Sequence, residues 1–386
     1  MSQEKLLTYR FGFVMEQNLG HRTHYRNLLR YVREDQTVSP TWMPIEFDSP
    51  RLLMRLPVIS SNWSARSSLI AWNAVRRAHQ AQQLAAVFYH TQVTSLLAPL
   101  HRGLPSIISL DATPINYDSV GTYYGHSSGG RMERYKYELN RRAFEHAVAL
   151  VTWCRWAKDS LIRDYGIAEE KITVIAPGVD LAQWPGHWAR ERARDAETRK
   201  PHLLFVGGDF ERKGGEVLLE CFHRYLQDTC ELSIVTQSPV APERNLHIYH
   251  NVAPNSDTLL RLYAQADIFV FPTLADCAPL AVPEAMAAAL PVVSTRIGAI
   301  PEMVRDGEQG LLVERGGADE LYTALKQLMD SPELRMRMGN RGRETVLEEY
   351  DAGHNAQRLL DLLKDVTNRA HQLPQPAQTE LVAARR

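Results

Sequence analysis

The segment that most constrains the fold is residues 271–313, FPTLADCAPLAVPEAMAAALPVVSTRIGAIPEMVRDGEQGLLV. Residues 267–272 predict a buried parallel strand that ends at proline. Residues 280–289 predict a helix with Pro283 in its first turn, where a missing N–H does no harm. The loop between them therefore lies at the carboxyl edge of a sheet and beside a helix N-terminus. Ligands, and anions in particular, bind at this place in open α/β sheets.

Two carboxylates belong to this loop and to the helix after it. Asp276 lies within the loop, and Glu284 lies on the helix that follows. A carboxylate can accept hydrogen bonds from two neighbouring hydroxyls, as in a sugar or a ribose. The alternative is structural, with Asp276 capping the helix and Glu284 favouring its first turns electrostatically. For Asp276 alone both interpretations stay open, and the pair beside an Ala/Pro loop favours ligand binding.

The order of these motifs resembles the signature of the family-four retaining glycosyltransferases, which have the GT-B fold. An acid is followed after seven residues by Glu-Ala-Met-Ala, then by Pro-Val-Val, Gly-Ala-Ile-Pro-Glu and Asp-Gly-Glu-x-Gly-Leu-Leu-Val. The resemblance implies that Asp276 holds the donor sugar and that Glu284 holds the nucleotide ribose. The backbone of Cys277, Ala278, Pro279 and Leu280 would orient the same sugar. Two departures, Asp276 where glutamate is usual and Cys-Ala-Pro where Gly-Phe-Gly is usual, bear on which sugar is held.

A glycine loop with two cations opens the second half of the chain. Residues 202–207 predict a strand, and Gly207-Gly208-Asp-Phe-Glu-Arg212-Lys213-Gly-Gly follows before an amphipathic helix. Glycines let the backbone approach a phosphate, and Arg212 and Lys213 can neutralise a diphosphate. The spacing is not that of a P-loop or of a complete dinucleotide fingerprint. We therefore expect a diphosphate site that needs no divalent metal and no cofactor besides the nucleotide sugar.

The first half offers weaker site candidates. Gly20 lies in a loop after a predicted first strand, and the resemblance implies that this loop lies near the donor phosphates. His90 and Asp111 directly follow two further predicted strands, residues 84–89 and 105–110, so both are candidates for contacts at the carboxyl edge of the sheet.

The resemblance also implies a histidine just before Asp111, at the reaction centre, and Leu110 stands there instead. His90 and His126 are the alternatives for the missing imidazole, and the sequence does not decide between them. Asp111 would accept a hydrogen bond from the acceptor hydroxyl or act as a base.

Composition excludes several classes of protein. The chain has 386 residues with a net charge of −1, so bulk charge predicts no nucleic-acid partner. Its four cysteines have no metal-ligand spacing, and no apolar run predicts a membrane span or a secretory signal, so we expect a cytoplasmic protein. Residues 49–110 contain arginines but no Asp or Glu. This basic region predicts peripheral contact with an anionic membrane or acceptor, or else a solvated face without a partner.

We therefore predict two doubly wound, Rossmann-like α/β domains facing across a cleft. The expected parts are an acceptor-binding domain (1–180), a linker (181–200), a nucleotide-sugar-binding domain (201–350), a helix crossing back to the first domain (351–371) and a disordered tail (372–386). The expected reaction moves a sugar, with UDP-sugar favoured, to a hydroxyl of a glycan, lipid-linked or small-molecule acceptor. The alternatives are an epimerase or phosphorylase on the same fold, or a non-catalytic relative that binds sugar nucleotides.

Overall fold

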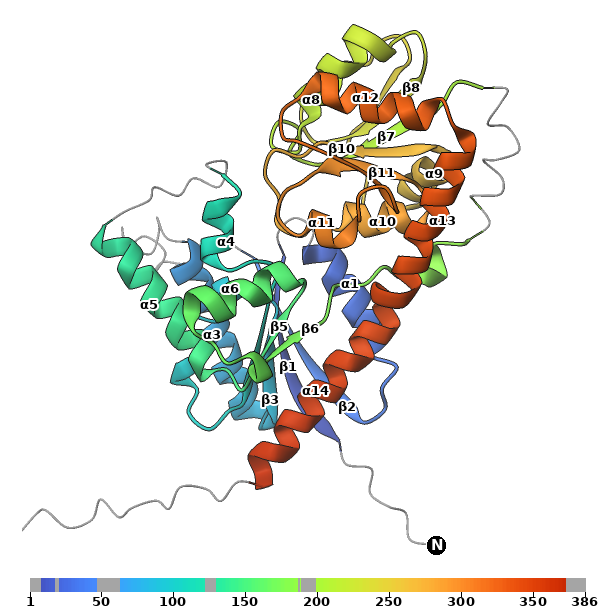
Figure 1. Ribbon diagram of the computed structural model, residues 1–386. Coiled ribbons are helices and arrows are strands. Elements are labelled where there is room, and N and C mark those ends of the chain that lie inside the picture. The colour runs from blue at the N-terminus through green and yellow to red at the C-terminus, as the bar shows by residue number, and fades with distance from the viewer. Residues whose placement is uncertain are drawn as a thin grey trace, which may run out of the picture.

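The computed structural model describes residues 8–17, 21–46, 63–121, 130–186, 188 and 199–372. These residues form two domains, each built on a parallel sheet, and Figure 1 shows one domain above the other. This confirms the predicted α/β class with two doubly wound domains. Among the earlier predictions, Gly20, His126, residues 189–198 of the linker and residues 373–386 of the tail lie outside the described residues.

The first domain holds a six-stranded sheet in the order β2-β1-β3-β4-β5-β6. Its strands are β1 (Tyr9–Glu16), β2 (Val38–Ile45), β3 (Ala86–Tyr89), β4 (Ser106–Leu110), β5 (Ala149–Thr152) and β6 (Ile172–Val174). Its α-helices are α1 (His21–Val32), α3 (Trp63–Gln82), α4 (Pro114–Ser119), α5 (Arg131–His146) and α6 (Arg155–Tyr165). Every residue of β3, β4 and β5 is buried, as expected for parallel strands covered on both faces.

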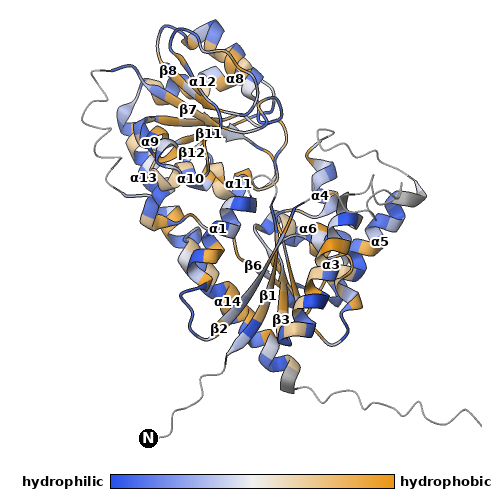
Figure 2. Ribbon diagram, turned by 180° about the vertical axis from the view of Figure 1, so that it is seen from behind, coloured by the Kyte–Doolittle hydropathy of each residue, from blue (hydrophilic) through white to orange (hydrophobic). Residues whose placement is uncertain are grey.

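The second domain holds a six-stranded sheet in the order β12-β11-β10-β7-β8-β9. Its strands are β7 (His202–Val206), β8 (Glu231–Val235), β9 (Leu246–Tyr249), β10 (Ile268–Phe271), β11 (Val292–Thr295) and β12 (Gly310–Val313). Its α-helices are α8 (Gly215–Cys221), α9 (Asp257–Gln265), α10 (Ala281–Ala287), α11 (Ile300–Met303), α12 (Ala318–Met329) and α13 (Pro332–Glu349). Figure 2 shows apolar strands inside this domain and more polar helices around them.

The last helix, α14 (Ala352–Gln372), leaves the second domain and packs on the first, as Figure 1 shows. Leu359, Leu360, Leu363 and Val366 of α14 join the apolar core formed by β1 and α1. Backbone contacts tie the start of the helix to the segment after β6, because Ala352 N–H donates to Val179 O at 3.1 Å. The chain therefore crosses twice between the domains, once on each side of this contact.

Strand β2 is an element that sequence reasoning left unassigned. It pairs in parallel with β1, from Tyr9 opposite Val38 to Glu16 opposite Ile45, and it lies at the edge of the sheet. Pro40 and Pro44 weaken its strand pattern, because proline cannot donate to a hydrogen-bond ladder. An edge strand tolerates this, since one side of its backbone has no neighbour to pair with.

Candidate active site

Both sheets reverse their winding direction at the junction between the domains. In the second sheet β7 and β10 are neighbours, although β8 and β9 lie between them in the chain. In the first sheet β1 and β3 are neighbours in the same way. Such a switch point opens a crevice at the carboxyl ends of the two central strands. The loops after β7 and β10 carry Lys213 and Asp276, and the loops after β1 and β3 lead to His21 and His90.

The glycine loop after β7 packs directly on the end of β10. Gly214 has a φ of +78°, and a Cβ there would lie 1.8 Å from Pro272 O, so only glycine fits. This contact brings the Lys213 ammonium to the Asp276 carboxylate, and the two form a salt bridge. The ammonium also lies 5.2 Å from the centre of the Phe271 ring. Burial lowers the pKa of Lys213, and the Asp276 charge acts in the opposite direction.

Arg212 joins the glycine loop to the loop that carries Asp276. Its Nε donates to Asp209 Oδ2 at 2.8 Å, and its Nη1 donates to Ala275 O at 2.9 Å. Its own carbonyl accepts from Leu274 N–H at 2.9 Å. Arg212 as a whole is only 8% exposed, so its charge lies inside the site while its hydrogen bonds hold both loops in place.

Glu284 is a buried carboxylate on α10, 8% exposed, and Tyr263 donates to its Oε2 at 3.2 Å. Burial raises its pKa to about 7. It borders a small cavity that is also lined by Thr23 and Asn27 of α1 and by the segment Gly178–Asp180. This cavity has room for about one water molecule. In this structure the cavity beside Glu284 is therefore too small for a ribose.

Asp111 faces this site from the first domain. It is buried, and Tyr117 donates to its two carboxylate oxygens at 3.3 and 3.2 Å. Burial raises its pKa, a positive charge on His21 would lower it, and the Asp276 charge raises it further. Ala112 and Cys277, the residues that follow the two acids in the chain, pack in one apolar cluster, so the two domains bring Asp111 and Asp276 close together. The structure therefore joins Asp111, Asp276 and Lys213 into one site.

Leu110 stands where the resemblance implies an imidazole, and His90 is the one of its two alternatives that the structure describes. Leu110 is fully buried in the apolar core, so its position does not point toward the site. His90 is also fully buried, and its ring lies among the rings of His21, His24 and Trp153. In this arrangement His90 has no surface with which to touch a substrate.

The loop that carries Asp276 also contacts the first domain. Cys277 packs with Ala112 and Val120 in a small apolar cluster between the domains. Gly298, with a φ of +56°, lies so close to this loop that a Cβ would meet Asp276 O at 2.3 Å. Ala299 N–H donates to Cys277 O at 2.7 Å, which fixes the start of α11.

Glu302 of α11 caps a helix of the other domain. Its Oε2 accepts from Arg155 N–H at 2.7 Å and its Oε1 accepts from Trp156 N–H at 2.6 Å, at the N-terminus of α6. The residue before α6, Cys154, provides no side-chain cap of its own. A carboxylate suits this position because the first N–H groups of a helix are unpaired and carry partial positive charge. The position of the loop that carries Asp276 is thus linked to the contact between the domains.

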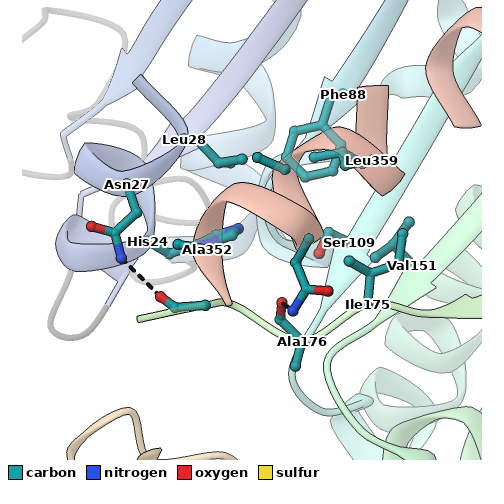
Figure 3. A pocket seen from close by; sticks show the side chains of 13 residues that line it. His24, Asn27, Leu28, Phe88, Ser109, Val151, Ile175, Ala176, Ala352 and Leu359 are labelled. Atoms are coloured by element: carbon teal, nitrogen blue, oxygen red, sulfur yellow. Dashed lines mark hydrogen bonds between the residues drawn. The ribbon is translucent and has the colours of Figure 1, made fainter. Parts of the chain in front are cut away.

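We refer to residues 175–180, the segment after β6 that leads out of the first domain, as the hinge. A second small cavity lies beside it, and Figure 3 shows the residues around this cavity. The Asn27 amide donates to Gly178 O at 2.8 Å, so α1 is fastened to the connecting segment. Asn355 of α14 donates to Ala176 O at 3.1 Å from the other side. Asp180 accepts from Arg30 Nη1 at 2.5 Å and from the Tyr31 hydroxyl at 2.8 Å. These polar contacts make α1 the element that rests on the hinge.

Most predicted donor-site residues lie together at the switch point of the second sheet. These are Gly207, Gly208, Arg212, Lys213, Asp276, Cys277, Ala278, Pro279, Leu280 and Glu284. Sequence reasoning missed His21, Tyr117 and Tyr263, which contact or approach the site from α1, α4 and α9. The alternation of strands and loops could have pointed to His21, because it begins the helix after the first strand. Nothing in the sequence marks the two tyrosines.

Solved structures share this arrangement over nearly the whole chain. Sucrose-phosphate synthase from Thermosynechococcus elongatus superposes on 94% of this chain and 100% of its own, with a TM-score of 0.75 and 16% identity. HepE from Anabaena, solved in complex with UDP-glucose, superposes on 92% of this chain and 99% of its own, with a TM-score of 0.67 and 14% identity. The fold is therefore that of the GT-B glycosyltransferases.

Sequence comparison gives the family. Residues 20–183 match the family described as Glycosyltransferase Family 4, and residues 200–331 match the family described as Glycosyl transferases group 1. The chain belongs to these family-four glycosyltransferases and is a transferase. It is 25% identical over 326 residues to alpha-maltose-1-phosphate synthase of Mycolicibacterium smegmatis, which covers 76% of this chain and 82% of that protein. It aligns with about half the length of further curated relatives.

Proposed function

We propose that this chain is a retaining hexosyltransferase that moves a sugar from a nucleotide-diphospho-sugar to a hydroxyl group without a divalent metal. The observation that carries this proposal is the Lys213–Asp276 salt bridge at the switch point. A cation that can face a diphosphate and an acid that can face sugar hydroxyls meet there in one place. Glu284 supplies a second acid on the next helix, suited to the two hydroxyls of a ribose.

UDP-sugar is the favoured donor. HepE, which shares the fold, was solved in complex with UDP-glucose. In this chain the glycine loop after β7 would cradle the diphosphate with Gly207 and Gly208. Lys213 would exchange its bond to Asp276 for one to the donor, and Asp276 and the backbone of residues 277–280 would then orient the sugar.

The chemistry follows from this placement. The bond between the anomeric carbon and the diphosphate oxygen breaks, and its electron pair stays on that oxygen. Lys213 and the buried charge of Arg212 stabilise the developing anion, an effect worth about 3–4 kcal/mol of barrier for one well-placed donor. The acceptor oxygen bonds to the anomeric carbon on the face that the leaving group vacates, and its proton passes to the departing phosphate oxygen. Asp111 holds the acceptor hydroxyl in place.

The acceptor is a glycan, a lipid-linked molecule or a small molecule, reached from the first domain. Arg76 and Arg77 on α3 are exposed, and Arg76 lies 5.6 Å from the centre of the Trp72 ring. Such a basic helix favours peripheral contact with an anionic membrane, which would place the protein at its cytoplasmic face. Among the described residues, no helix has the length and apolarity needed to cross a bilayer. Sedimentation with anionic vesicles tests this contact, and the absence of salt-sensitive binding would contradict it.

Calorimetric binding of UDP, GDP and ADP tests the donor site. We expect one nucleotide to bind, Lys213→Ala to lose most of that affinity, and Lys326→Ala to keep it. Lys326 is a suitable control because it lies on α12 with its side chain 54% exposed. Failure of all three nucleotides to bind would favour a non-catalytic relative. Product analysis with and without acceptor separates transfer from epimerisation and phosphorolysis, and the same assay with EDTA tests the metal-free proposal.

A further inference from the structure

Three histidine rings gather where the first sheet reverses its direction. His21 and His24 lie on the first turns of α1, and His90 follows β3. The ring centres of His24 and His90 are 4.9 Å apart, and those of His21 and His90 are 5.0 Å apart. Trp153, after β5, lies beside all three at 5.3 to 5.7 Å. We refer to His21, His24, His90 and Trp153 as the imidazole cluster.

The cluster contains several buried polar atoms without a partner. They are Nδ1 of His21, Nδ1 of His24 and both ring nitrogens of His90, considered over the part of the chain that the structure describes. Burial and the neighbouring imidazoles lower the pKa of His24 to about 3 and hold the pKa of His90 well below its usual value. Both rings are therefore neutral. Unsatisfied buried nitrogens are rare in native proteins, and several in one place indicate a functional role.

The cluster lies directly beside Asp111. Strands β4 and β5 pair so that Leu110 is opposite Thr152, which places the next residues, Asp111 and Trp153, side by side. The His21 ring contacts Trp153 and lies near enough to influence the Asp111 carboxyl. His21 is partly exposed, whereas His24 and His90 are buried. Of the three rings, His21 is the one that has surface to offer to a substrate.

We propose that His21 contacts the attacking hydroxyl and positions it beside Asp111. The other members of the imidazole cluster, His24, His90 and Trp153, fix the orientation of the His21 ring from its buried side. This inference rests on the proposed function. The chain lacks an imidazole at Leu110, and the start of α1 supplies one from the neighbouring switch-point loop instead. An imidazole N–H can donate to the hydroxyl oxygen while the Asp111 carboxylate accepts the hydroxyl proton, so His21 and Asp111 together can hold a hydroxyl by both atoms.

Hydrolysis of UDP-glucose, GDP-glucose and ADP-glucose without added acceptor tests the inference, because water then takes the place of the hydroxyl. We expect His21→Ala to lower kcat for hydrolysis at least tenfold while the dissociation constant of the nucleotide changes less than twofold. His21→Asn, which keeps a hydrogen-bonding side chain, should recover part of the rate. His79→Ala is the matched control, because His79 is an exposed histidine on α3 of the same domain.

Each other outcome has a distinct meaning. Hydrolysis by His21→Ala at the wild-type rate would overturn the assignment of His21. Equal loss of nucleotide affinity and rate would place His21 at the donor diphosphate and overturn it as well. A wild-type protein that binds a nucleotide but hydrolyses none of the three sugars would also contradict a site that orients a hydroxyl. Absence of both binding and hydrolysis in the wild type would overturn the proposed function itself. Circular dichroism and the melting temperatures of both His21 variants show whether they are folded.

Discussion

The carboxylate of Glu302 accepts a hydrogen bond from the backbone N–H of Trp156 at 2.6 Å, although these residues belong to different domains. Arg155 N–H donates to the second oxygen, so one side chain caps α6 from across the junction. The residue before α11, Ala299, donates to Cys277 O in the loop that carries Asp276. Separation of the domains would therefore uncap α6 and remove a support of this loop at the same time.

Replacement of Glu302 by alanine should loosen the junction. Loss of a helix cap costs about 0.5–2 kcal/mol, and here the cost falls on the contact between domains. We expect faster hydrogen exchange at the amides of Arg155 and Trp156 and a larger radius of gyration in X-ray scattering. Glu308→Ala is the control, because Glu308 is half exposed in the same domain. Unchanged exchange at both amides would show that the cap does not hold the domains.

Nucleotide binding should depend on pH through Glu284. Its pKa of about 7 means that half of the carboxyl groups are protonated near neutral pH. Ribose hydroxyls donate to the ionised form, so binding releases a proton. Affinity should therefore weaken about tenfold for each pH unit below 7 and level off above it. Calorimetry from pH 5.5 to 8.5 measures this slope, and Glu284→Gln should remove it. A flat profile in the wild type would contradict the assignment of Glu284.

The same carboxyl should make the free protein less stable in alkali. The folded pKa of Glu284 is about 7, above the ordinary 4.5. Below pH 4.5 this carboxyl therefore does not lower the free energy of unfolding. Between pH 4.5 and 7 the loss of stability grows, and above pH 7 it stays constant. The difference of 2.5 pKa units, 7 minus 4.5, corresponds to about 3 kcal/mol at pH 8. Glu284→Gln should therefore raise the free energy of unfolding at pH 8 and change it little at pH 4.5. Denaturant titration at both values tests this, with exposed Glu344→Gln as the control.

The Lys213–Asp276 salt bridge should also support the fold. Its side chains are 15% and 10% exposed, so removing Lys213 leaves a mostly buried carboxylate without its partner. Breaking a buried pair from one side costs about 3–5 kcal/mol. We expect Lys213→Met to destabilise the protein by this amount and Lys213→Met with Asp276→Asn to recover much of it without restoring nucleotide binding. Additive effects of the two changes in urea titrations would contradict the coupling.

Two glycines with similar backbone angles provide a matched pair. Gly214 and Gly307 have φ values of +78° and +82°, but an added Cβ at Gly214 would meet Pro272 O, whereas Gly307 faces open space. Gly307→Ala should cost about 1–2 kcal/mol through backbone strain alone. Gly214→Ala should cost a further 1–3 kcal/mol or so through overpacking, and it should weaken nucleotide binding. Similar losses of stability in the two variants would show that the close approach to Pro272 does not add to the cost of a Cβ at Gly214.

Sequence reasoning predicted the elements around the candidate donor site because their signals are local. Strand, glycine loop, cations and helix follow one another between His202 and Cys221, so their order in the chain is also their order in space. The arrangement of His21, His90 and Asp111 in the first domain depends on packing instead. That His90 is enclosed while His21 keeps exposed surface follows from how α1 rests on β3 and β5. The cap that Glu302 provides joins residues 146 positions apart, and no local pattern predicts such a contact. Strand β2 was missed because its two prolines are tolerated only at a sheet edge, and edge position is a property of the assembled sheet.

Helix α14 has a consequence for the order in which the protein can fold during synthesis. The sheet of the second domain uses residues between His202 and Val313, so that domain can close as soon as its own helices have left the ribosome. The first domain is made earlier, but part of its apolar core comes from Leu359, Leu360 and Leu363, near the end of the chain. The domain that emerges first is thus completed last. A nascent chain that stops before Ala352 should keep an apolar face of β1 and α1 open to chaperones and proteases, and pulse proteolysis of stalled chains would detect it.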